Sequence, residues 1–244
     1  MNPTTVVPLN IGFVTHRYAE WTMLMVGEAV FSLLVEEALE ADGYYITFYC
    51  GLTTVTLLMY SHFQSQPMEA EKHAMVKSKN RAIVSQTIQS IYTLSLVALG
   101  AAFTLFVRSF AGQGYAGRRW LEFLDELALD QRFLAGGGDS KYSQDDLNER
   151  AGIIFSIALG LVFFSLDFMS LVLHLGTEVL MKNCRTKPVC TYLVFIRGVL
   201  IAVTLSISQW TKDPEILAPI GLGCALLHNM LVTRSSHVIT EDGE

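Results

Sequence analysis

The sequence predicts an all-α fold, a polytopic bundle of about six transmembrane helices. Of its 244 residues, 51% are hydrophobic and only 16% are charged, and the mean hydropathy is +0.39. One water-soluble core of ordinary composition cannot bury that much apolar surface. The apolar residues gather in long runs and lack the period-two alternation of transmembrane strands. We therefore expect an integral, multi-pass membrane protein whose first partner is the lipid bilayer.

The predicted spans follow from the positions of these apolar runs. Each run is close to the ~20 residues that cross a hydrocarbon layer of ~30 Å, although Pro219 and His228 interrupt the last one. We expect one transmembrane domain over residues 1–244, with a short flexible segment at residues 1–15 and a flexible acidic tail at residues 235–244. The spans are residues 20–38, 44–63, 84–107, 153–175, 189–209 and 216–233.

Small and polar residues recur three, four or seven positions apart within the spans, which places them on one face of each helix. Such stripes allow helix backbones to approach closely and hydroxyl groups to bond across the interface, so their simplest role is bundle packing. In the second to sixth spans they include Thr47, Gly51, Thr54, Gln89, Thr93, Gly100, Ser156, Gly160, Thr204, Gly221 and Cys224.

For the long segment between the third and fourth spans the sequence predicts a different type of helix. Between residues 118 and 134 the apolar side chains fall on one helical face, opposite acidic and basic side chains. This pattern predicts an amphipathic helix on the membrane surface in the long outer loop, with a protein-facing helix as the alternative. The apolar face consists of Trp120, Phe123, Leu124, Leu127 and Leu134.

Basic residues near the span ends predict the orientation of the chain. If the N-terminus is cytoplasmic, the short cytoplasmic loops carry two basic clusters, whereas the short outer loops carry only Lys212. Because basic residues concentrate in cytoplasmic loops, we predict a cytoplasmic N-terminus. The clusters are Lys72, Lys77, Lys79 and Arg81 after the second span, and Lys182, Arg185 and Lys187 after the fourth.

Asp167 and Arg197 lie deep inside predicted spans, where a charge must find a partner, a proton or water. Their helices are joined by a short hairpin, and both residues are roughly 12 Å from the cytoplasmic end at a rise of ~1.5 Å per residue. We predict that Asp167 and Arg197 form an ion pair. The pair either fixes the register of the bundle or takes part in function.

Glu28 lies in the middle of the first span, near the same predicted depth as this pair. Its cation would be Arg197, His228 or His174, and without one it would favour its protonated form and could load and release a proton. His174 and His228 lie near the inner ends of their spans, and imidazole titrates where a proton-linked carrier needs it. The alternative is a Glu28 that only joins helices by hydrogen bonding. Because no HxxxH or ExxH spacing occurs, we expect no metal site.

Residues 16–28 carry a motif, His16-Arg-Tyr-Ala-Glu-Trp-Thr-Met-Leu-Met-Val-Gly-Glu28. It resembles the bacterial low temperature requirement A (LtrA) membrane-protein family, whose pattern pairs an Arg with a later Gly-Glu, here Arg17, Gly27 and Glu28. The family's earlier half, with its acidic Phe-Phe-Asp motif, is missing, so the chain resembles the later part of a full-length member. The resemblance implies a multi-pass membrane protein with no firmly established biochemical activity. A half-length bundle would form a homo-oligomer or take the missing half from a partner.

Composition and motifs exclude several classes of protein. The net charge is −6 and the basic residues form no stripe, so we expect no nucleic acid as a partner. No nucleophile elbow, phosphate loop or zinc-protease motif occurs, so we expect no enzyme of the soluble type and no cofactor. Three classes are left. The first is a transporter or channel that handles protons or a small polar solute through Glu28, Asp167 and Arg197, and the others are a non-catalytic membrane scaffold or stress-related interaction protein and a membrane-embedded enzyme. We expect the first of these, and not an enzyme.

Overall fold

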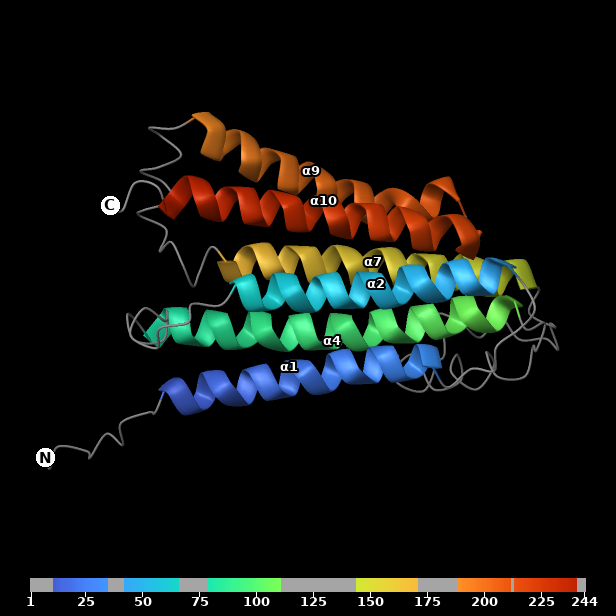
Figure 1. Ribbon diagram of the computed structural model, residues 1–244, viewed down its shortest axis with the longest axis horizontal. Coiled ribbons are helices and arrows are strands. Elements are labelled where there is room, and N and C mark those ends of the chain that lie inside the picture. Colours follow the sequence, from blue (N-terminus) through green and yellow to red (C-terminus); the bar gives the residue numbers. More distant parts are fainter. Residues whose placement is uncertain are drawn as a thin grey trace, which may run out of the picture.

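The computed structural model describes residues 11–34, 42–65, 79–110, 144–170, 188–211 and 213–240. This part of the chain forms α-helices and contains no strand, which confirms the predicted helical bundle (Figure 1). The predicted surface helix at residues 118–134 lies outside the described residues. The helices are α1 (Ile11–Leu34), α2 (Asp42–Ser65), α4 (Lys79–Phe110), α7 (Gln144–Ser170), α9 (Pro188–Trp210) and α10 (Pro214–Thr240).

The helices run side by side along the long axis of the molecule (Figure 1). Three of them, α1, α4 and α9, begin at one end of the bundle, which we call the proximal end, and the other three end there. The opposite end is the distal end. The central pair is α4 and α7, with α1 packed against α4 on one side and α9 packed against α7 on the other. α10 packs against α2 and α9.

The helices extend past the predicted spans at both termini. α1 begins at Ile11 and α10 ends at Thr240, so parts of the terminal segments that we expected to be flexible are helical. Hydropathy marks the residues that favour lipid, whereas helical hydrogen bonds continue wherever the backbone geometry is uninterrupted. α10 also continues through Pro219.

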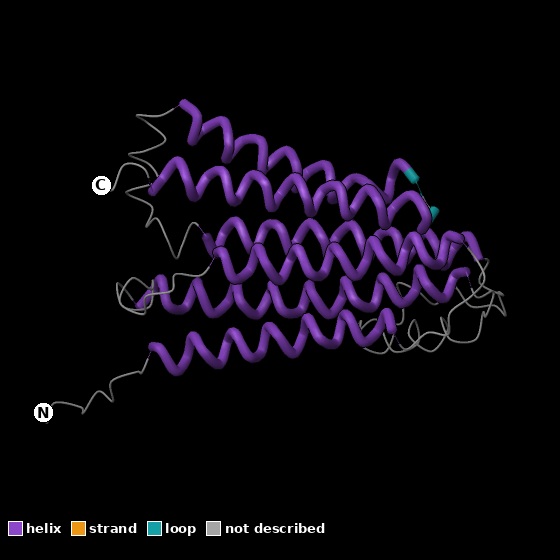
Figure 2. Tube along the Cα trace, in the orientation of Figure 1, coloured by secondary structure: helices purple, strands orange, loops and turns teal. Residues whose placement is uncertain are grey.

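A short turn joins α9 to α10, and it contains the described residues that lie outside helices (Figure 2). The backbone N–H of Asp213 donates to Oγ1 of Thr211 at 3.2 Å. The backbone carbonyl of Asp213 accepts from the N–H groups of Ile216 and Leu217, at 3.1 and 3.0 Å. Pro214 opens α10, at a position where its missing N–H costs no helical hydrogen bond. The turn therefore makes α9 and α10 an antiparallel pair.

The bundle is apolar on its outside and partly polar inside. Leu94 is 71% exposed and Phe195 is 67% exposed, and many other large hydrophobic side chains also point outward. The interior combines apolar residues with buried threonines and serines and with His62, Gln89 and His228. A water-soluble bundle has the opposite pattern, because contiguous exposed apolar surface is unfavourable in water. The outer surface is therefore suited to lipid.

Four of the described helices are long and apolar enough to cross a membrane, so the protein is an integral membrane protein. The candidate membrane spans are Asn80–Val107, Asn148–Ser170, Tyr192–Trp210 and Pro214–Arg234. α1 and α2 do not reach the same apolarity, because α1 carries several charged residues and α2 is rich in tyrosine and threonine. That α1 and α2 also cross the membrane stays a prediction, which their packing beside α4 favours.

An aromatic cluster fills the core of the distal half. The ring of Phe155 on α7 lies 5.3 Å from that of Phe103 and 5.2 Å from that of Phe106, both on α4, measured between centroids. All three side chains are fully buried. The bulkier polar side chains of the interior lie in the proximal half instead, and this half contains the candidate site.

Candidate functional site

Asp167, Arg197 and His228 meet where α7, α9 and α10 pack together, and we call them the Asp167 cluster. Oδ1 of Asp167 accepts a hydrogen bond from Nη1 of Arg197 at 3.3 Å and lies 3.1 Å from Nε2 of His228. The side chains are 17%, 11% and 0% exposed, in the order Asp167, Arg197, His228. The predicted ion pair is confirmed, and the structure adds His228 to it.

Glycines lie at the contacts of α7 with α9 and α10. A Cβ at Gly160 of α7 would lie 2.6 Å from Cδ2 of Leu205 on α9. A Cβ at Gly221 of α10 would lie 3.0 Å from Cε1 of Phe155 on α7. Small residues at such positions bring helix backbones together in a membrane. Two small residues of the predicted stripes therefore lie where α7 packs against α9 and α10.

Arg197 connects three helices. Its Nη1 donates to Asp167 on α7, and its Nη2 donates to the backbone carbonyl of Leu231 on α10 at 3.0 Å. A guanidinium group can do this because its donors form a rigid planar fork. The bond to the carbonyl adds to the ion pair in offsetting the cost of burying the cation.

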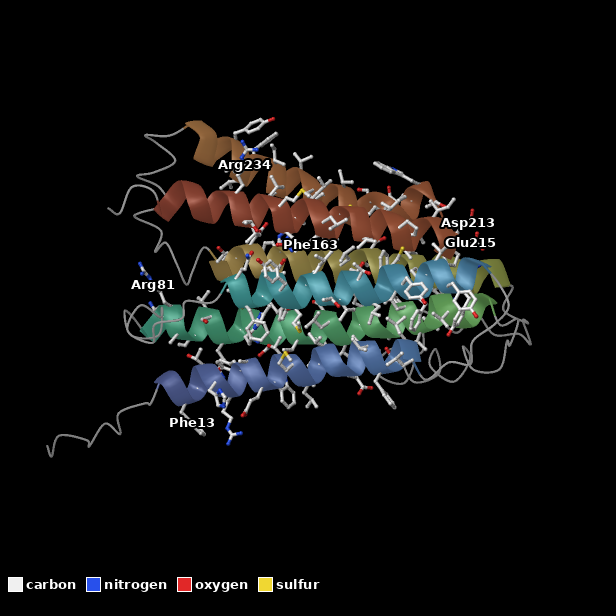
Figure 3. The ribbon with its side chains drawn as sticks, viewed as in Figure 1. Phe13, Arg81, Phe163, Asp213, Glu215 and Arg234 are labelled. Atoms are coloured by element: carbon white, nitrogen blue, oxygen red, sulfur yellow. The ribbon has the colours of Figure 1, made fainter. Side chains whose placement is uncertain are left out.

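His228 is held by ring stacking. Its imidazole stacks on the ring of Phe163, with centroids 4.6 Å apart and planes 9° from parallel; Figure 3 labels Phe163. An ionised carboxylate only accepts hydrogen bonds, so neutral His228 carries its hydrogen on Nε2, toward Asp167. Nδ1 is then an acceptor, and no described residue donates a hydrogen bond to it. The cluster therefore contains a buried basic nitrogen beside a carboxylate.

Glu28 does not join the cluster, so the prediction that Arg197 or His228 is its cation is wrong. It lies on the exposed face of α1, and α4 separates α1 from α7 and α9 (Figure 1). Because α1 begins at Ile11, Glu28 is also about 26 Å from the first residue of its helix. The two described cations proposed for Glu28 both contact Asp167 instead. His174 lies outside the described residues.

Arg17 and Gly27, which resemble the family's pattern together with Glu28, also lie on the exposed face of α1. Nη1 of Arg17 donates to Oε2 of Glu20 at 2.7 Å, and its guanidinium lies 5.1 Å from the ring centroid of Phe13. A Cβ at Gly27 would meet nothing within 4 Å. Within the described part of the chain, Gly27 therefore takes no part in helix packing, and Arg17 contacts only neighbouring residues of α1.

His62 is a buried polar residue that sequence reasoning missed. Its ring is 0% exposed and stacks on Tyr92 of α4, with centroids 4.9 Å apart. Also in the bundle interior, Nε2 of Gln89 donates a hydrogen bond to Oγ1 of Thr22 at 2.8 Å and so joins α4 to α1. His62 is the second-last residue of its predicted span, a position typical of interfacial residues, so its burial had no signal in the sequence.

The cluster brings an imidazole, a carboxylate and a guanidinium group into contact in the bundle interior. Among the described residues, no group of three His, Cys, Asp or Glu side chains could hold a metal ion. Comparison of the chain with protein-family models, with curated proteins and with solved structures found no match.

Proposed function

We propose that this membrane protein handles protons or a small polar solute at the Asp167 cluster. The observation that carries the proposal is the environment of His228. Its side chain is fully buried, its Nε2 faces the carboxylate of Asp167, and no described residue donates a hydrogen bond to its Nδ1. A proton taken up at Nδ1 gives an imidazolium 3.1 Å from the carboxylate of Asp167. Attraction between these charges in a medium of low dielectric offsets the cost of burying them.

The charge balance of the cluster suits a proton-handling site. With His228 neutral, the charges of Arg197 and Asp167 cancel. With His228 protonated, the cluster carries one positive charge. Release of the proton removes this charge, or an anionic solute that binds at the cluster balances it. Ionisable residues that change charge inside a membrane are typical of proton relays in transporters.

The proposal includes a cytoplasmic N-terminus. Arg81 and Arg234 lie at the proximal end, where α1 begins, and Asp213 and Glu215 lie at the distal end (Figure 3). The linkers that join α2 to α4 and α7 to α9 connect helices at the proximal end. The first basic cluster lies in the α2–α4 linker and at the start of α4, and the second lies in the α7–α9 linker. The preference of basic residues for the cytoplasmic side supports a cytoplasmic proximal end.

We extend the proposal to a protein of the LtrA type, on the resemblance of residues 16–28 to that family. Gly27 and Glu28 lie on the exposed face of α1. They are accessible there to a second copy of the chain or to a partner that supplies the family's missing half.

The test is proton flux into liposomes that contain purified protein, with wild type compared with His228→Gln. Glutamine can still donate to Asp167 but cannot carry a proton, so flux should be lost while the protein stays folded, as checked by size-exclusion chromatography. His62→Gln is the matched control, because His62 is equally buried and ring-stacked but lies outside the cluster. Unchanged flux in folded His228→Gln would remove His228 from the mechanism.

The alternative is a non-catalytic membrane scaffold or stress-related interaction protein in which the charges are structural. The observation that favours it is the double role of Arg197, which binds α7 and α10 at once. This alternative predicts that charge-removing variants lose folded protein and that the folded wild type moves no protons. The flux and size-exclusion data from the same samples separate the two functions.

A further inference from the structure

A groove runs along the outer surface between α2 and α10, on a different face of α10 from the Asp167 cluster. Its volume is about 490 Å³. Leu226 and Met230 line it from α10 and Tyr60 lines it from α2, and these side chains are 41%, 66% and 50% exposed. α10 is one of the apolar helices that can cross a membrane, so this part of the groove faces the hydrocarbon layer. Its apolar wall is therefore suited to an acyl chain.

Polar groups lie toward the proximal end of the groove. Arg234 lines it, is exposed, and forms no ion pair with any described residue (Figure 3). Asn229 also lines it, and Oδ1 of Asn229 is buried without a hydrogen-bond partner among the described residues. At this level Thr233 donates to Oε1 of Gln64 at 3.3 Å. The groove therefore changes from apolar to polar along its length and ends at a cation.

The spacing of these residues matches one leaflet of a bilayer. Leu226 and Arg234 are separated by about 12 Å along α10, at a rise of 1.5 Å per residue. Half of a ~30 Å hydrocarbon layer is ~15 Å. An acyl chain that passes Leu226 and Met230 therefore brings the phosphate of its lipid to the level of Arg234, where guanidinium recognises phosphate through paired hydrogen bonds.

We propose that this groove is a binding site for an anionic phospholipid, with the phosphate at Arg234 and an acyl chain along Met230 and Leu226. The ester oxygens lie at the level of Asn229, whose side-chain NH2 group can donate hydrogen bonds to them. The site does not depend on the function proposed for the Asp167 cluster.

The test is native mass spectrometry of the full chain, delipidated in detergent and given equal amounts of phosphatidylglycerol and phosphatidylcholine. Wild type should retain phosphatidylglycerol in preference. Arg234→Gln should reduce that preference roughly fivefold, the usual contribution of one basic residue near an anionic membrane surface. Arg17→Gln is the control, since Arg17 is an exposed arginine that already contacts Glu20.

A second variant tests the groove separately from the charge. Met230→Trp changes an exposed position, so the protein should fold, but the indole should fill the groove and reduce retention of both lipids. Equal retention of the two lipids by wild type would overturn the proposal. So would a preference that survives Arg234→Gln, or one that is lost equally in Arg17→Gln. If lipid binds only after Glu241, Asp242 and Glu244 are neutralised, the acidic tail of the chain is the occupant of the groove and the proposal is wrong.

Discussion

Replacing Asp167 by asparagine should destabilise the bundle through Arg197. Asparagine has nearly the same shape and keeps an oxygen that can accept from Nε2 of His228, 3.1 Å from Oδ1 in the wild type. Only the negative charge is lost. Arg197, whose side chain is 11% exposed, keeps its bond to the neutral carbonyl of Leu231 but becomes an unbalanced buried cation.

The magnitude follows from this geometry. Breaking one side of a buried ion pair costs roughly 3–5 kcal/mol, and we expect about 3 kcal/mol because 17% of the Asp167 side chain is exposed. Arg197→Met should cost roughly the same, because it leaves the carboxylate unbalanced. The double variant carries neither charge. Its loss in the free energy of unfolding should therefore be smaller than the sum of the single losses by at least ~1.5 kcal/mol.

The assay is reversible unfolding in mixed micelles with increasing sodium dodecyl sulfate, applied to wild type, both single variants and the double variant. Glu20→Gln is the control, because the pair of Glu20 with Arg17 is exposed and should contribute less than about 1 kcal/mol. Single losses that add up to the double loss within about 0.5 kcal/mol would refute the coupling of Asp167 to Arg197.

Three further changes test packing, hydrogen bonding and contact with lipid. Gly100→Leu should lower the free energy of unfolding by at least ~2 kcal/mol, because a Cβ there would lie 3.0 Å from the backbone of α1. Gly27→Leu should be neutral, because a Cβ there meets nothing within 4 Å. Equal denaturation midpoints of the two variants in detergent would contradict this. Gln89→Met should cost about 1 kcal/mol in the same assay by removing a buried hydrogen bond to α1, and an unchanged midpoint would show that the bond contributes nothing. In a background without native cysteines, a cysteine at Leu94 should resist a water-soluble maleimide in liposomes while one at Asp213 reacts, and equal labelling would contradict lipid contact at Leu94.

Residues that are close along one helix, or on helices joined by a short hairpin, could be compared from the sequence alone. The rise of an α-helix fixes how far each residue lies from the end of its span. Asp167 and Arg197 lie at matching distances from the inner ends of their predicted spans, so their pairing was predictable. The helical fold was predictable for the same local reason, since the apolar runs specify helices of the length that a membrane requires.

Which side of each helix points into the bundle, by contrast, was decided only by the tertiary structure. Lipid is as apolar as the core, so a membrane helix lacks the polar face that orients a helix in water. For this reason the sequence predicted the depth of Glu28 in its span but not that it lies on the exposed face of α1. The contact of His228 with Asp167 joins residues far apart in the chain and depends on how α10 packs against α7 and α9. The sequence by itself determined the helix content, and the packing of distant helices determined which side chains meet.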